Sequence, residues 1–163
     1  MDEELQVNAR DCLRHSVATL AYRGGKVLRG APPGFGSFKV GSTSRTPSEI
    51  LAHICDLFDW ALSLLHGRDV WRDSPPGSWD SDVNRFFSTL GALDGLLAVP
   101  GSLGCPWTGF LQGPMADALT HVGQLAMLRR LAGSPVRSEN YFIAEIVIGR
   151  VGPDQATPRR EFE

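Results

Sequence analysis

Four long segments of the sequence repeat apolar residues at intervals of three and four, the spacing of one face of an α-helix. This periodicity predicts an all-α protein. One face of the first segment is formed by Leu5, Cys12, Leu13, Ser16, Val17 and Leu20. The pair Gly24-Gly25 is expected to end this first helix, because glycine is unfavourable inside a helix and common after its end.

The clearest helix start lies at Thr46-Pro47-Ser48-Glu49. A hydroxyl N-cap is followed there by proline at the first helical position and by glutamate three residues after the cap. This second helix is expected to run to His66-Gly67, the third from about Trp79 to Ala98, and the fourth from Gly113-Pro114 to Gly133. We predict a short fifth helix from Tyr141 to Ile148, although its β-branched residues also suit a strand.

A chain of 163 residues fits one domain, and 42% apolar residues are ordinary for a globular core. We therefore predict a single helical-bundle domain over residues 1–163. Its main interruptions are a long Gly/Pro/Ser-rich loop at 24–46, which can cover a site, and a surface tail at 153–163. The long connections also permit a crossover, so that a simple up-down-up-down order is not required.

Charge and composition exclude several classes of function. The net charge of −2 gives no electrostatic reason to expect nucleic acid as a partner. No apolar run approaches the roughly 18 residues that a membrane span needs, and the acidic N-terminus is unlike a secretory signal. The three cysteines include no CxxC pair, so we expect reduced thiols and a cytoplasmic location.

Polar residues interrupt two of the apolar faces. His53 lies among large apolar side chains on the second helix, between Ile50 and Leu57. On the fourth helix, Asp117, His121 and Gln124 are spaced by four and three residues and so project from one face. Burying such groups without partners costs several kcal/mol in total, about 1–3 kcal/mol for each. We therefore expect a shared partner to satisfy them.

A divalent metal would satisfy these groups together. Two imidazoles and a carboxylate suit Zn, Fe, Ni or Mn, and three protein ligands leave coordination positions open. His53, Asp117 and His121 are the candidate ligands, and Gln124 is expected to hold a ligand in orientation. The alternatives are a simple Asp117–His121 charge pair on a half-exposed face and a hydrogen-bonded core histidine at position 53.

The remaining polar candidates are weaker. His15 has no partner at helical spacing, and His66 is explained by its place at a helix C-terminus. Asp56 lies one turn from His53; we expect it to be solvated, with a role at the site as the alternative. The pair Arg129-Arg130 is interpreted as charge at a helix C-terminus. The four tryptophans are interpreted as packing residues or loop anchors rather than as a cofactor site: Trp60, Trp71, Trp79 and Trp107.

The same residues carry a family resemblance. The segment TPSEILAHICDLFDWAL resembles the second helix of the DinB/YfiT-like family of metal-binding helical proteins, with His53 at its metal-ligand position. The segment DALTHVGQLAMLRRLAG resembles the family's fourth helix, where HxxxHxxQ precedes an apolar run. Here His121 and Gln124 match the second histidine and the glutamine. The resemblance extends from about Leu5 to Gly133.

The resemblance implies a four-helix bundle of up-down-down-up order, a divalent metal and frequently a homodimer. Asp117 replaces the first histidine of the family motif. This change leaves either a two-histidine, one-carboxylate ligand set or a weakened, empty site. Some family members are thiol-dependent S-transferases or isomerases, which implies a small-molecule substrate and a low-molecular-weight thiol. The stretch ENYFIAEIVIGRVG resembles a C-terminal extension of some members.

Two functions from different classes follow. The first is a metal-dependent enzyme in which His53, Asp117 and His121 hold the ion and the open positions bind substrate or thiol. The second is a non-catalytic helical protein that dimerises or binds a partner, in which the metal site is vestigial or empty. Stoichiometric metal that depends on His53 favours the first function, and complete folding without metal favours the second.

Overall fold

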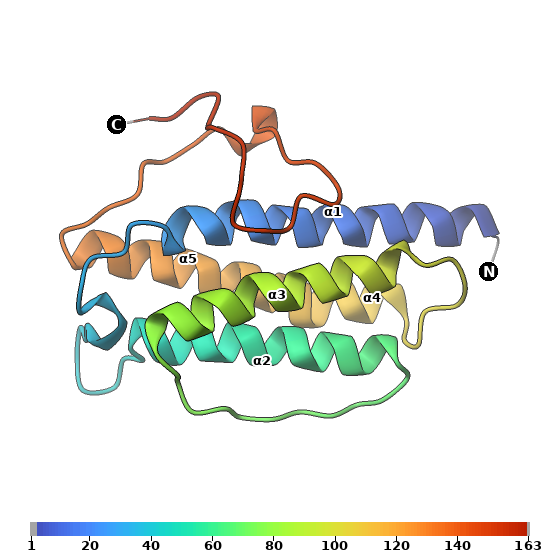
Figure 1. Ribbon diagram of the computed structural model, residues 1–163, viewed down its shortest axis with the longest axis horizontal. Coiled ribbons are helices and arrows are strands. Elements are labelled where there is room, and N and C mark those ends of the chain that lie inside the picture. The colour runs from blue at the N-terminus through green and yellow to red at the C-terminus, as the bar shows by residue number, and fades with distance from the viewer. Residues whose placement is uncertain (1–2, 163) are drawn as a thin grey trace.

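Helices account for most of the structure, a computed structural model that describes residues 3–162 and, in the first helix, the side chains from Ala9 onward. Its long helices are α1 (Glu3–Leu28), α2 (Pro47–Leu65), α3 (Trp79–Ala98) and α5 (Ala116–Leu131). The short helix α4 (Trp107–Phe110) and the turn η2 (Leu111–Met115) lead into α5. The predicted all-α bundle is confirmed (Figure 1). Leu5, predicted on one face of the first helix, has a side chain outside those that the structure describes.

The chain direction follows the up-down-down-up order (Figure 1). The Cys55 thiol contacts the Asp82 carbonyl, and Arg85 binds Asp59 four residues further along α2, so α2 and α3 run in the same direction. Because α2 and α3 are consecutive and parallel, the chain must cross back between them. Residues 66–78 form this crossover and return along the length of the bundle. Arg14 of α1 pairs with Asp94 of α3 at 2.8 Å.

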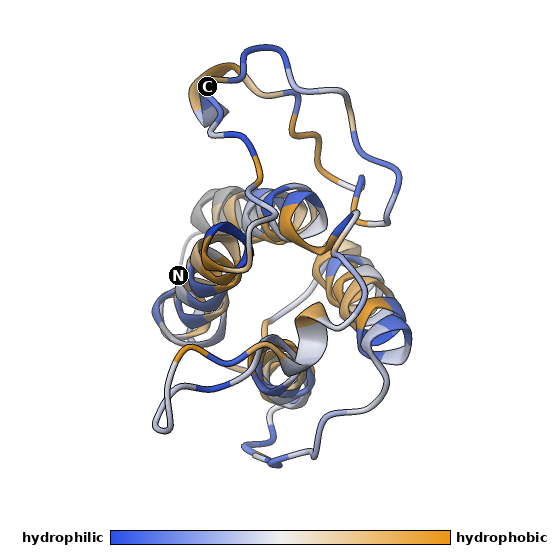
Figure 2. Ribbon diagram, turned by 90° about the vertical axis from the view of Figure 1, so that its left-hand side faces the viewer, coloured by the Kyte–Doolittle hydropathy of each residue, from blue (hydrophilic) through white to orange (hydrophobic). Residues whose placement is uncertain are grey.

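The core lies between the four long helices, whose hydrophobic faces turn toward the bundle axis (Figure 2). Large buried side chains from each of them meet there, including Leu20, Phe58, Phe86 and Leu125. None of the helices in residues 3–162 combines the length and the apolar character needed to cross a membrane.

The predicted start of α2 and both ends of α3 are confirmed. The Thr46 hydroxyl accepts a hydrogen bond from the Glu49 N–H at 3.2 Å, and the Glu49 carboxylate accepts one from the Thr46 N–H at 2.7 Å. This reciprocal pair satisfies two N–H groups that have no partner within the helix. Helix α3 spans Trp79–Ala98, as its apolar spacing predicts.

The expected end of the first helix at Gly24-Gly25 is wrong, because α1 continues to Leu28. Both glycines are buried against α3. A methyl group on Gly24 would overlap the ring of Phe86, which is fully buried, so glycine is needed there for close packing of two helices. The loop predicted at 24–46 consequently begins at Arg29 and includes the short turn η1 (Phe35–Ser37).

Gly24→Ala is therefore expected to destabilise the protein by about 1–3 kcal/mol, the usual cost of overpacking a core. The adjacent Gly25→Ala serves as a matched control, since its methyl group would meet Phe87 at an ordinary 3.4 Å. That substitution is expected to be neutral or to stabilise the helix by up to about 1 kcal/mol. Urea unfolding of both variants measures the difference, and equal stabilities would contradict the packing role of Gly24.

The fourth helical segment, formed by α4, η2 and α5, starts before Gly113-Pro114, where the sequence predicts its beginning. Helix α4 begins at Trp107 and continues through η2, a π-helical turn, into α5. Gly113 has a ψ of −105°, outside the helical range, and Pro114 has no N–H to donate, so the segment kinks here. The glycine and proline mark this kink, which lies just before Asp117.

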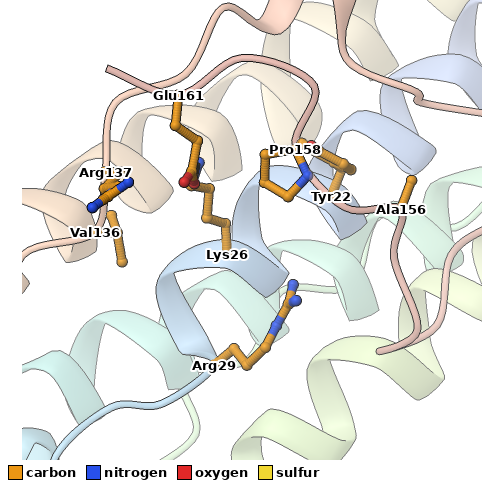
Figure 3. A pocket seen from close by; sticks show the side chains of 8 residues that line it. All are labelled: Tyr22, Lys26, Arg29, Val136, Arg137, Ala156, Pro158 and Glu161. Carbon is orange, nitrogen blue, oxygen red and sulfur yellow. Dashed lines mark hydrogen bonds and ion pairs between the residues drawn. The ribbon is translucent and has the colours of Figure 1, made fainter. Parts of the chain in front are cut away.

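The predicted fifth helix over 141–148 is limited to one 3-10 turn, η3 (Tyr141–Ile143). The rest of the tail follows α1 and doubles back, pairing Glu139 with Glu161 in an isolated antiparallel bridge. The Glu139 carboxylate is fully buried and accepts hydrogen bonds from Tyr22 at 2.5 Å and Lys26 at 2.8 Å. Ion pairs with α1, rather than helix formation, fix this segment. Lys26 also meets Glu161 in the hollow between tail and helix (Figure 3).

The Tyr22 phenol is expected to ionise well above its ordinary value of about 10. Burial raises the pKa of Tyr22, and the hydrogen bond to Glu139 raises this pKa further. Because the folded pKa lies above the unfolded one, the associated stability is present below pH 10 and is lost as the pH rises beyond it. Ultraviolet absorbance during alkaline titration measures this phase, and Tyr22→Phe should remove it. Ionisation of Tyr22 at or below its ordinary pKa would contradict the account.

Candidate metal centre

The predicted site residues come together from two antiparallel helices. His53 lies on α2, and Asp117 and His121 lie one turn apart on α5. The kink at η2 sets the start of α5 and therefore the position of Asp117. The side chains of His53 and His121 are 20% and 13% exposed, and that of Asp117 is 47% exposed. The group therefore lies at the edge of the bundle, with its carboxylate reachable from solvent.

The distances within the group match those between the ligands of one ion. Zinc binds nitrogen and oxygen at about 2.0–2.2 Å, so two ligand atoms of a tetrahedral ion lie roughly 3.3 Å apart. Oδ1 of Asp117 lies 3.3 Å from His121 Nε2, and Oδ2 of the same carboxylate lies 3.9 Å from His53 Nε2. One ligand atom from each residue lies within 4.8 Å of the others, so these three residues form a group that can hold a metal ion.

Gln124 occupies the position expected of a residue that orients a ligand. Its side-chain oxygen lies 2.8 Å from His121 Nδ1. In the neutral tautomer in which Nδ1–H donates to Gln124, Nε2 keeps its lone pair and directs it toward Asp117. A lone pair facing a carboxylate oxygen at 3.3 Å is repulsive unless a proton or a cation lies between them. The hydrogen bond therefore prepares Nε2 as a ligand atom.

His53 is held by aromatic contacts. Its ring packs edge-to-face on the ring of Trp71 at 5.6 Å and on that of His121 at 4.7 Å. Trp71 comes from the crossover after α2 and packs against Trp60, whose N–H donates to Asp69. Trp71 is thus a loop anchor, as the sequence predicts, and it fixes the imidazole of His53.

Electrostatics favours the neutral form of His53. Burial lowers the pKa of His53, and the electrostatic effects of His121 and Arg45 lower this pKa further, against the opposing effects of Asp117 and Asp56. A neutral imidazole is the form that binds a metal. A charge pair uses one imidazole for one carboxylate, whereas two imidazoles share Asp117 here. A divalent ion satisfies all three groups together, so the donor set fits a metal.

Asp56 takes no part in the group, and its expected solvated position is wrong. This carboxylate is 3% exposed, with one oxygen 2.7 Å from Arg85 and the other accepting the Ser74 N–H at 2.8 Å. The contacts tie α3 and the crossover to α2. The other two histidines also lie elsewhere: His15 is exposed on α1, and His66 caps the end of α2 through the Leu62 carbonyl.

Several residues near the metal group have no signal in the sequence that marks them as functional. Ser44 and Arg45, from the loop before α2, line an open hollow next to His53 and His121. Met127 of α5 also lines it and is 57% exposed. A loop residue without periodic spacing can be placed at a site only when the course of the loop is known, although the length of this loop indicates a role.

The fold and this group define the class of protein. It is an all-helical bundle of four long helices with a two-histidine, one-carboxylate group that can hold a metal ion. Comparisons with protein-family models, curated proteins and solved structures give no significant match to the chain. Membership of the DinB/YfiT-like family therefore stays a prediction that rests on the motifs around His53 and His121.

Proposed function

We propose that the protein is a metal-dependent enzyme of the DinB/YfiT-like kind that acts on a small molecule. The observation that carries this proposal is the convergence of His53, Asp117 and His121, with ligand atoms within 4.8 Å of one another, beside an open hollow. Three protein ligands leave room in the coordination sphere, as in catalytic rather than structural metal sites.

The three ligands and their neighbours have separate tasks. His53 and His121 provide neutral nitrogen atoms, and Asp117 provides the negative charge. Gln124 and Trp71 fix the two imidazoles. A divalent ion bound there acts as a Lewis acid and lowers the pKa of a water or thiol that it binds. The group opens toward the hollow, so a small molecule can approach from solvent without moving a helix.

The finer points of the proposal rest on the family resemblance. It implies a low-molecular-weight thiol as co-substrate, transfer of a group to that thiol or isomerisation as the reaction, and a homodimer. Zn, Ni, Fe and Mn are all compatible with two imidazoles and a carboxylate. The position of Asp117 within 4 Å of both histidines supports the ligand interpretation over an empty site.

Metal analysis of protein purified without chelators tests the proposal. We expect about one divalent ion per chain. After replacement by Co(II), addition of 2-mercaptoethanol should produce a sulfur-to-cobalt charge-transfer band, because open positions accept a thiolate. Protein that takes up none of Zn, Ni, Mn or Fe(II) would refute the proposal and favour the non-catalytic binding protein. Bound metal without any thiol response would remove the thiol from it.

A further inference from the structure

The hollow beside the metal group has the size of a small-molecule site. It measures about 560 Å³, within the roughly 300–1,000 Å³ that such sites occupy. His53 and His121 form one side of it, at the metal group. Ile50, Met127 and Leu128 form an apolar wall on α2 and α5. A ligand that reaches the metal group from this hollow therefore has an apolar surface to cover.

Arg45 is the cationic side chain of this hollow. It is exposed, and in the described part of the chain its guanidinium makes no hydrogen bond or ion pair. Glu49 lines a smaller hollow together with Arg45, but its carboxylate is engaged by the Thr46 N–H of the helix cap. The same cap fixes the backbone directly after Arg45, so the side chain of Arg45 extends from a restrained backbone position.

Charge at the site favours an anion. Two neutral imidazoles and one carboxylate leave a divalent ion with one uncompensated positive charge, to which Arg45 adds another. Arg45 lines the same hollow as His53 and His121, so its charge lies beside the metal group. A planar guanidinium binds a carboxylate through two parallel hydrogen bonds. With a single arginine in the lining, a monoanionic carboxylate is a closer match than a phosphate dianion.

We infer that the hollow binds a small organic acid with an apolar body, whose carboxylate pairs with Arg45 and whose body lies against Ile50, Met127 and Leu128. This inference rests on the proposed function and names the substrate class for the same site. Met127 suits such a ligand because a thioether side chain adapts to apolar surfaces of different shape. Binding in this orientation places the far end of the acid next to His53 and His121.

Calorimetric titration of the zinc-loaded, full-length protein tests the inference. The probe is octanoate, with 1-octanol as the neutral control and acetate as the control without an apolar body. We expect octanoate to bind at least about tenfold more tightly than either. Arg45→Gln should weaken octanoate binding by about tenfold to a hundredfold. Lys39→Gln, the same charge change in the same loop but outside the hollow, should leave binding unchanged.

A zinc titration of the same variants separates this inference from the proposed function. Both are expected to bind zinc as the parent protein does, because neither residue is a ligand. Zinc uptake together with octanoate binding that is insensitive to Arg45→Gln, or no stronger than octanol binding, would overturn the inference alone. Failure of the parent protein to bind zinc would overturn the proposed function and the inference with it.

Discussion

His53→Ala is expected to lower the zinc affinity of the protein by more than about a hundredfold. Loss of a residue that only hydrogen-bonds to a metal ligand already lowers metal affinity by up to about a hundredfold, and His53 is itself a proposed ligand. Asp117→Ala and His121→Ala should act similarly, because each removes one of three ligand atoms that converge from two helices. Competition with a chromophoric chelator measures the affinity. A variant that lacks one of the three residues and keeps the parent affinity would remove that residue from the ligand set.

The graded response of two further variants makes this prediction specific. Gln124→Ala should weaken zinc binding by about tenfold to a hundredfold, because it removes the hydrogen bond that orients His121. His15→Ala should have no effect, because His15 is exposed on α1, away from the group. Equal effects of the two substitutions would show that Gln124 does not act through His121.

Arg129→Met is expected to reduce stability by about 3–5 kcal/mol. The sequence interpretation of Arg129 as helix C-terminal charge is incomplete, because this guanidinium is buried and donates to the carbonyls of Val27, Arg29, Gly30 and Ser134. It thereby joins the ends of α1 and α5. Methionine fills a similar volume but makes none of these hydrogen bonds, and it leaves the buried Val27 carbonyl without its donor, which alone costs about 1–3 kcal/mol.

The neighbouring Arg130→Met is the matched control, since Arg130 is exposed on the same turn. It should change stability by less than about 0.5 kcal/mol. Thermal unfolding separates the two, with a Tm lower by roughly 6–20 °C for Arg129→Met. Similar losses for both variants would show that the charge near the helix end matters, and not the buried hydrogen bonds.

Local signals predict the helices well where packing and propensity agree. Thr46 and Glu49 form the cap that their spacing indicates, and α3 begins and ends as predicted. The prediction is wrong where tertiary contacts override local preference. Gly24 lies inside α1 rather than at its end, because α3 packs so close to α1 that a side chain at this position would overlap Phe86. The tail segment 141–148 forms only one 3-10 turn, and the flanking residues Glu139 and Glu161 bind the tail to Lys26 of α1.

The candidate site shows the same division. The spacing of Asp117, His121 and Gln124 places them on one helix face without any knowledge of the fold. The contact of His53 with these residues depends on how α2 is aligned along α5. The sequence predicts this alignment only through the family resemblance. Arg45 and Trp71 lie in loops between helices, where no periodic spacing predicts the position of a side chain. The ligand set could therefore be predicted from sequence, whereas the hollow that would receive a substrate could not.

The most direct test of the metal centre is anomalous diffraction from crystals of the protein grown with zinc. We expect one strong peak about 2.0–2.2 Å from Nε2 of His53, from Nε2 of His121 and from a carboxylate oxygen of Asp117. We also expect a fourth ligand that is not a protein atom and that faces the hollow lined by Arg45. Zinc bound only at other residues, with His121 and Asp117 left as a direct ion pair, would contradict the proposed metal centre.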